Sequence, residues 1–262
     1  MLFVWCKVSF DEKRSHGSAV CETVYFFVEF VCVFPWKCVS LNNQNRGKIM
    51  DGILRKLPIG IQTFEKLREG DYLYVDKTAL VWRIASTETP YFLSRPRRFG
   101  KSLLLSTFEA YFEGKKELFE GLAIADMEKE WKTYPLFHLD LNAEKYDSPQ
   151  ALVEILSRQL TQWELKYGKG EDEETLSGRF AGVIRRASEQ ADRGVVVLVD
   201  EYDKPLLQAL GDDALLDDYR KTLKAFYGVL KSSDRYLRFV FLTGVTKFAQ
   251  VSVFSDLNQL ND

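Results

Sequence analysis

Cysteine is scarce in this sequence and confined to one end of it. All four cysteines precede residue 50 in a chain of 262 residues, no two share a Cys-x-x-Cys spacing, and His16 is the only histidine near them. A zinc site or a disulfide framework is therefore the weaker interpretation of this segment. The four are Cys6, Cys21, Cys32 and Cys38.

Long apolar runs are missing as well. The most apolar stretch near the N-terminus, residues 24–34, is interrupted by Glu29 and is too short to span a bilayer. It is not followed by a clean signal-peptide cleavage site. We expect residues 1–49 to be an atypical leader or extension that is poorly ordered, with Met50 as the natural start. We also expect a cytoplasmic protein without a membrane partner.

The chain has almost no net charge. Its 36 basic and 38 acidic residues give a formal net charge of −2, so electrostatics offers no reason to expect nucleic acid as the main partner. The hydrophobic share is 46%, which is enough for a substantial core. Residues 50–262 are expected to form one large domain.

Residues 91–105 have the layout of a phosphate-binding loop. An apolar run at 91–93 leads into a basic turn, and Gly100, Lys101 and Ser102 open a helical pattern. A helix N-terminus offers free N–H groups and a favourable dipole to an anion. In this interpretation Lys101 reaches the β- and γ-phosphates and Ser102 ligates Mg²⁺. The expected nucleotide-binding loop consists of Arg95, Pro96, Arg97, Arg98, Phe99, Gly100, Lys101 and Ser102, with Arg95 where the motif has its first glycine.

The next strong pattern is a run of five apolar residues at 195–199 that ends in Asp200 and Glu201. Such a run fits a central strand of a parallel sheet that is buried on both faces. Open α/β sheets bind ligands at the carboxyl ends of their strands. We expect Asp200 to hold Mg²⁺ and Glu201 to act as the general base that orients the attacking water.

A further buried strand is expected at residues 238–244. It ends in Thr243, whose hydroxyl could sense the γ-phosphate from a neighbouring strand. Because right-handed crossovers place all strand ends of a parallel sheet on one edge, Lys101, Ser102, Asp200, Glu201 and Thr243 should meet there.

The alternation of strands and helices predicts a three-layer α/β/α fold of the P-loop NTPase type with a mostly parallel sheet. Helices are expected at 63–68, 76–85, 101–113, 148–167, 175–192 and 215–230. Strands are expected at 72–75, 91–93, 136–141, 195–199 and 238–244.

Each site residue also has a plainer interpretation. Lys101 could be a surface lysine at a helix start, and Asp200 with Glu201 a solvated strand end. The three arginines of the loop could form a solvated turn, or could neutralise nucleotide or nucleic-acid charge. Thr243 could simply end a strand.

Two other segments are open to two interpretations. Asp76 and Thr78 could cap a helix or lie beside the nucleotide. His138, inside an apolar strand, is better explained as a satisfied core histidine than as a ligand.

Five stretches, in order, resemble the bacterial AAA-ATPase-like family. They are LPIGIQTF (57–64), YVDKT (74–78), RPRRFGKS (95–102), DEYDKP (200–205) and LTGVTKF (242–248). The third is also similar to the GPRRxGK[ST] loop of related signalling and archaeal ATPases, with Arg95 in place of glycine. The resemblance covers residues 50–262.

The resemblance implies a P-loop fold with an extra strand between the loop strand and the acidic strand, which residues 136–141 supply. It implies phosphate and Mg²⁺ contacts for Lys101 and Ser102, Mg²⁺ and water contacts for Asp200 and Glu201, and a sensor role for Thr243. In that family a nuclease-like domain of the PD-(D/E)XK type commonly follows. This chain is expected to be truncated before the helical lid and that domain.

The expected function is ATP binding with Mg²⁺-dependent hydrolysis, by attack of a Glu201-oriented water on the γ-phosphate. The alternative is a nucleotide-gated interaction module with little or no turnover. A phosphotransferase is a weaker rival, because it needs no water-activating Glu201. Partners would be the nucleotide and a second copy in a homo-oligomer, and a nucleic-acid task would reside in sequence outside this chain.

Overall fold

The computed structural model describes residues 55–246, except 88, 143 and 144. The expected leader at 1–49 and its predicted poor order lie outside the described residues. No helix in the described part of the chain is both long and apolar enough to cross a membrane.

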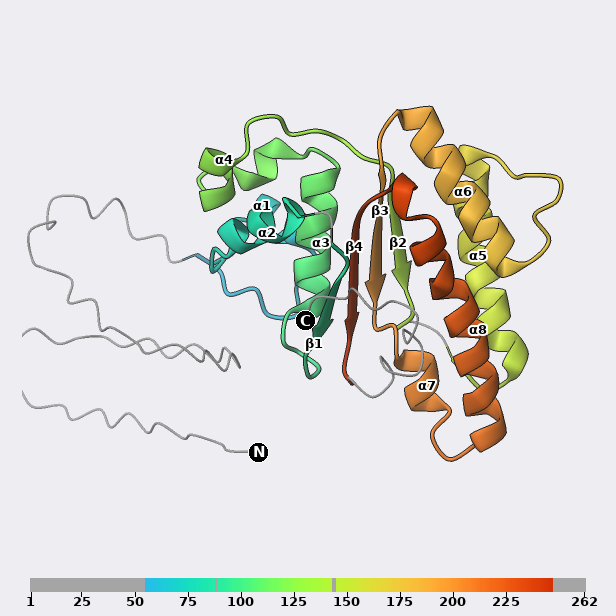
Figure 1. Ribbon diagram of the computed structural model, residues 1–262. Coiled ribbons are helices and arrows are strands. Elements are labelled where there is room, and N and C mark those ends of the chain that lie inside the picture. The colour runs from blue at the N-terminus through green and yellow to red at the C-terminus, as the bar shows by residue number, and fades with distance from the viewer. Residues whose placement is uncertain (1–54, 88, 143–144, 247–262) are drawn as a thin grey trace, which may run out of the picture. The chain divides into compact units, whose positions relative to one another are not determined.

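A four-stranded parallel sheet forms the centre of the described domain (Figure 1). Every strand pair is parallel, and the order across the sheet is β1-β4-β3-β2. This confirms the predicted α/β fold with a parallel sheet. The strands are β1 (Tyr91–Ser94), β2 (Leu136–Asp140), β3 (Val195–Asp200) and β4 (Leu237–Gly244).

Helices cover both faces of the sheet, in agreement with the three-layer prediction. One face carries α1 (Phe64–Glu69), α2 (Thr78–Ala85), α3 (Lys101–Phe112), η1 (Lys116–Phe119) and α4 (Ala123–Met127). The other face carries α5 (Pro149–Tyr167), α6 (Leu176–Ala191) and α8 (Asp213–Ser232). The short elements α7 (Lys204–Gln208) and η2 (Asp234–Tyr236) follow β3 and α8.

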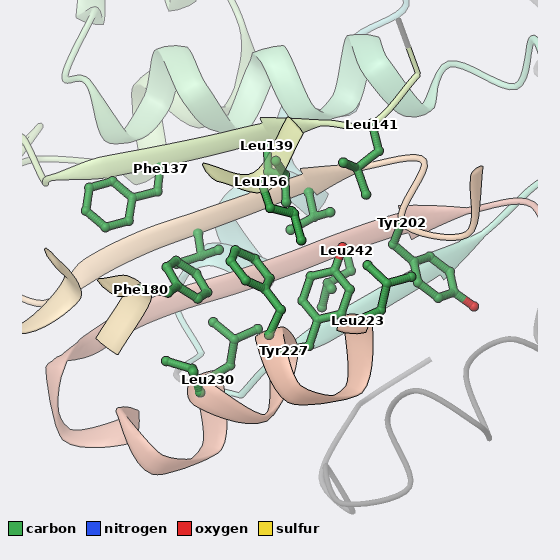
Figure 2. Close-up of a cluster of buried hydrophobic side chains, with 14 of the residues drawn as sticks. Phe137, Leu139, Leu141, Leu156, Phe180, Tyr202, Leu223, Tyr227, Leu230 and Leu242 are labelled. Atoms are coloured by element: carbon green, nitrogen blue, oxygen red, sulfur yellow. The ribbon is translucent and has the colours of Figure 1, made fainter. Parts of the chain in front are cut away.

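Strand β3 is buried along its whole length, because its side chains pack into a hydrophobic core on each face of the sheet. Val195, Val197 and Val199 pack against the α5–α6–α8 side, whereas Val196 and Leu198 pack against the α1–α4 side. The period of two along a strand produces this division. Figure 2 shows the first of these clusters, where Phe180, Leu223 and Tyr227 from the helices meet Leu139 and Leu242 from the sheet.

Two expectations about strands are wrong. Residues 72–75 form no strand: Tyr72 makes a single parallel bridge with Lys56, and Val75 is 61% exposed. Alternation alone cannot form a strand where only one short neighbour is available for pairing. The second concerns residues 136–141, which were expected to supply the strand between the loop strand and the acidic strand. In the sheet, β4 lies between β1 and β3, and β2 lies at the edge.

Two helix starts also depend on contacts that the sequence pattern did not reveal. Helix α8 begins at Asp213, two residues before the expected start, because Asp212 accepts a hydrogen bond from the Leu215 N–H at 3.0 Å. Thr63, the residue expected to begin this helix, precedes α1, and its side chain makes no capping hydrogen bond to that helix. The Phe64 N–H instead donates to Ser106 Oγ of α3 at 2.9 Å.

Candidate functional site

The loop between β1 and α3 owes its shape to two left-handed residues. Gly100, immediately before α3, has φ of 75°, and Arg98 has φ of 68°. A Cβ on Gly100 would meet no atom within 4 Å, so the backbone conformation, not crowding within the protein, requires glycine there. Arg95 is outside the left-handed region, and its N–H donates to Gly244 O at 3.1 Å, which extends the β1–β4 ladder. The backbone therefore does not need glycine at position 95.

Lys101 is turned inward beneath this loop and is only 4% exposed. Its ammonium group lies 3.0 Å from Glu201 Oε1 and donates to the carbonyl oxygens of Arg95 (3.0 Å) and Pro96 (3.3 Å). A solvated surface lysine would not be buried in this way, so that plainer interpretation does not describe Lys101.

Asp200 joins the loop helix to two strands. Its carboxylate is 5% exposed and accepts hydrogen bonds from Ser102 Oγ at 2.6 Å and Thr243 Oγ1 at 2.5 Å. No cationic side chain contacts it among the residues that the structure describes. A buried carboxylate is costly unless it is compensated by hydrogen bonds or a cation, and the partners found for Asp200 within the described ranges are two hydroxyls.

Glu201 completes the group with an unusual backbone. Its φ is 53°, a left-handed value that is uncommon for residues other than glycine. Its N–H donates to Thr243 Oγ1 at 3.3 Å, and its carboxylate pairs with Lys101. The structure thus brings Lys101, Ser102, Asp200, Glu201 and Thr243 together at the carboxyl edge of the sheet.

The three loop arginines do not join this cluster. Arg95, Arg97 and Arg98 are exposed, and the Arg95 guanidinium donates to the neighbouring Ser94 O at 2.8 Å. Phe99 is half-buried. The three arginine side chains of the loop are therefore accessible positive charges, and they make no ion pair within the described ranges.

Tyr202 and Asp203 are residues whose importance sequence reasoning missed. Fully buried Asp203 accepts hydrogen bonds from the N–H groups of Val245 and Thr246 and from the Thr246 hydroxyl. The Tyr202 hydroxyl donates to Thr246 O at 2.9 Å, and burial raises the pKa of this phenol. The only signal in the sequence was their place in the DEYDKP stretch.

Asp76 and Thr78 connect the start of α2 to the start of α4 by hydrogen bonds. Asp76 accepts hydrogen bonds from the N–H and hydroxyl of Thr78 and from the Ala123 N–H at the start of α4, while Thr78 Oγ1 accepts from Ile124 N–H. Partial burial opposes the ionised form of Asp76, but these hydrogen bonds outweigh it and lower its pKa. The cap interpretation therefore accounts for every oxygen of this carboxylate.

His138 is half-buried and only partly satisfied. Its Nδ1 lies 3.4 Å from Glu109 Oε2 of α3, and its buried Nε2 has no hydrogen-bond partner within the described residues. Burial lowers the pKa of His138, but the hydrogen bond and charge of Glu109 outweigh burial and raise it overall. The expectation of a satisfied core histidine holds for one nitrogen only.

Comparison with known proteins gives two matches. A family model described as "Predicted AAA-ATPase" matches residues 58–254. An "Uncharacterized protein in vnfD 5'region" from Azotobacter chroococcum mcd 1 is 43% identical over 209 residues, which make up 79% of this chain and 40% of that protein. The chain therefore spans less than half the length of this relative. No solved structure matches at a significant level.

Proposed function

The chain belongs to the predicted AAA-ATPase family, and from this premise we propose that it binds ATP with Mg²⁺ at the carboxyl edge of its sheet and hydrolyses the γ-phosphate. The observation that carries the proposal is the hydrogen-bonded set Ser102–Asp200–Thr243, with the Lys101–Glu201 pair beside it. These residues come from three separate segments, and no structural need of a parallel sheet requires this combination at its edge.

The donor set is suited to Mg²⁺. Mg²⁺ prefers hard oxygen ligands, usually one or two from the protein together with phosphate oxygens and water. Ser102 Oγ and the carboxylate of Asp200 would supply them, and they already lie 2.6 Å apart. The buried charge of Asp200, which no side-chain cation balances within the described part of the chain, is consistent with a metal ligand.

The remaining roles follow from position. The loop residues 95–102 would surround the phosphates, and Lys101 would exchange its contacts with Glu201 and the loop carbonyls for phosphate oxygens. When bound, Mg²⁺ would neutralise charge on the β- and γ-phosphates. Glu201, released from Lys101, would orient the attacking water. Thr243, hydrogen-bonded to both acidic residues, would report the state of the site to β4.

One observation favours the alternative of a nucleotide-gated module with little turnover. The carboxylate of Glu201 is 3.0 Å from Lys101 Nζ, and a carboxylate held by a lysine is a poor base for water. If this pair persists with nucleotide bound, ATP would act as a conformational ligand only.

Two variants test the proposal on the full chain. Glu201→Gln should lower phosphate release by about 100-fold or more, the usual loss for a general base, and leave Mg·ATP affinity unchanged in calorimetry. Lys101→Met should weaken binding by about 10- to 100-fold, because charged hydrogen bonds contribute about 1.5–3 kcal/mol.

Lys115→Met is a matched control for the second variant. Lys115 also pairs with glutamate, at 2.9 Å from Glu113 and 3.2 Å from Glu65, but it lies beyond the far end of α3. It should leave ATP affinity unchanged. Equal affinity of wild type and Lys101→Met would refute the nucleotide site, and absence of turnover in wild type with intact binding would favour the gated module.

A further inference from the structure

Asp203 occupies a helix N-cap position but does not cap its helix. It precedes α7, and its side chain makes no hydrogen bond to that helix, although aspartate at this position normally does so. Its carboxylate instead accepts hydrogen bonds from Val245 N–H at 3.0 Å, Thr246 N–H at 2.7 Å and Thr246 Oγ1 at 2.9 Å. The side chain therefore connects the turn after β3 to the chain that leaves β4.

Tyr202 reinforces the same connection. Its N–H donates to Thr243 O at 2.9 Å and its hydroxyl to Thr246 O at 2.9 Å. Its ring packs edge-on against Phe92 of β1, with centroids 5.2 Å apart. Figure 2 shows the ring at one end of the buried cluster, with the hydroxyl directed away from it. We call Tyr202, Asp203, Val245 and Thr246 the strand-exit clamp.

The clamp lies directly next to a strained residue. Glu201, adjacent to Tyr202, is in the left-handed region at φ of 53°. A non-glycine residue keeps such a conformation only where its surroundings hold it. Two hydrogen bonds to Thr243 and the clamp fix the turn on its C-terminal side.

We propose that Asp203 is the positioning residue for Glu201: by fastening the turn to the exit of β4, it keeps the Glu201 carboxylate at the phosphate edge. The inference rests on the proposed function, because it assigns to Asp203 the placement of the group that would orient water. Asp203 touches no reacting atom itself, so its loss should affect turnover more than nucleotide binding.

The test compares Asp203→Ala with Asp212→Ala in the full chain. Asp212 is a matched control, because its carboxylate caps α8 by accepting the Leu215 N–H at 3.0 Å, away from the site. Asp203→Ala should lower kcat at least tenfold and leave KM and Mg·ATP affinity within about threefold. Asp212→Ala should lower the melting temperature but leave kcat unchanged. Asp203→Asn, whose amide oxygen can still accept the Thr246 N–H, should restore part of the loss.

Amide hydrogen exchange provides a readout that does not depend on turnover. The N–H groups of Tyr202 and Val245 should exchange at least tenfold faster in Asp203→Ala than in wild type, because their acceptors move or disappear. The buried amides of β3 should exchange at the wild-type rate.

The possible outcomes separate the two proposals. Unchanged kcat in Asp203→Ala, or equal loss of kcat and ATP affinity in both Asp203 variants, would overturn the positioning role. If wild type shows no hydrolysis, that part of the proposed function fails, and amide exchange then decides the clamp. Unchanged exchange at Tyr202 and Val245 would refute it.

Discussion

Replacing Gly244 with alanine should destabilise the domain by about 1–3 kcal/mol, the usual cost of adding a methyl group to a filled interior. A Cβ at this position would lie 2.4 Å from Cε1 and 2.5 Å from Cδ1 of Tyr202, and 2.9 Å from Asp203 Oδ1. Non-bonded carbon atoms prefer a separation of about 3.5–4.0 Å. Either the new methyl group or its neighbours must therefore move.

Neither neighbour can move freely. The Tyr202 ring is fully buried, packs on Phe92 and is held through its hydroxyl by Thr246 O. Asp203 is fixed by three donors. The φ of Gly244 is not left-handed, so alanine would be tolerated there on backbone grounds. The predicted cost therefore arises from crowding alone.

Urea unfolding followed by tryptophan fluorescence would measure this cost, and Gly228→Ala is the matched control. Gly228 lies inside α8, where a Cβ would meet no atom within 4 Å. Alanine there should stabilise the protein by about 0.5–1 kcal/mol, because glycine is a poor helix former. The two variants should thus shift the midpoint in opposite directions. A neutral or stabilising Gly244→Ala would refute the close packing of Tyr202 against the end of β4.

Three further predictions concern the rest of the domain. Glu164→Leu should cost about 3–5 kcal/mol in urea unfolding, because it removes the carboxylate that pairs with the buried Arg179 guanidinium at 2.8 and 2.7 Å and leaves that charge with neutral acceptors only. The double variant with Arg179→Leu should recover most of that loss, and failure to recover would contradict this account. Asp76→Ala should lower the free energy of unfolding by about 1–2 kcal/mol, because the N–H groups at the starts of α2 and α4 lose their acceptor. An unchanged melting temperature would show that Asp76 does not stabilise these helix starts. The pKa of His138 is raised and that of Glu109 is lowered in the folded protein, so their pairing stabilises the fold fully at pH values above the pKa of glutamate and below the pKa of histidine in the unfolded chain. The difference in unfolding free energy between wild type and Glu109→Gln should therefore shrink as pH rises from about 6 to about 9 and His138 loses its proton. A difference that does not depend on pH would contradict this prediction.

The strongly periodic parts of the fold could be predicted from the sequence. The runs that became β2 and β3, and the helices that became α3, α5 and α6, end within one or two residues of their expected limits. Each combines a long apolar pattern with a capping or breaking residue. Parallel strand ends share one edge, and this rule anticipated that Ser102, Asp200 and Thr243 would be neighbours.

What could not be predicted depends on contacts between distant segments. Strand order is one case: nothing local to residues 237–244 reveals that this strand lies between β1 and β3. Asp203 is another, because an aspartate before a helix predicts a cap, and only the fold brings Thr246 close enough to compete for its carboxylate. The left-handed Glu201 likewise has no signature in composition or period.

The position of β4 has a consequence for how the domain is assembled. It is the last strand of the described chain, yet it lies between the first strand and the third. The sheet can be completed only after β4 has been synthesised, because β4 pairs with both β1 and β3. Pairings of such long sequence separation form slowly, so we expect the pairing of β1 with β4 to form last among the strand pairs of the described sheet.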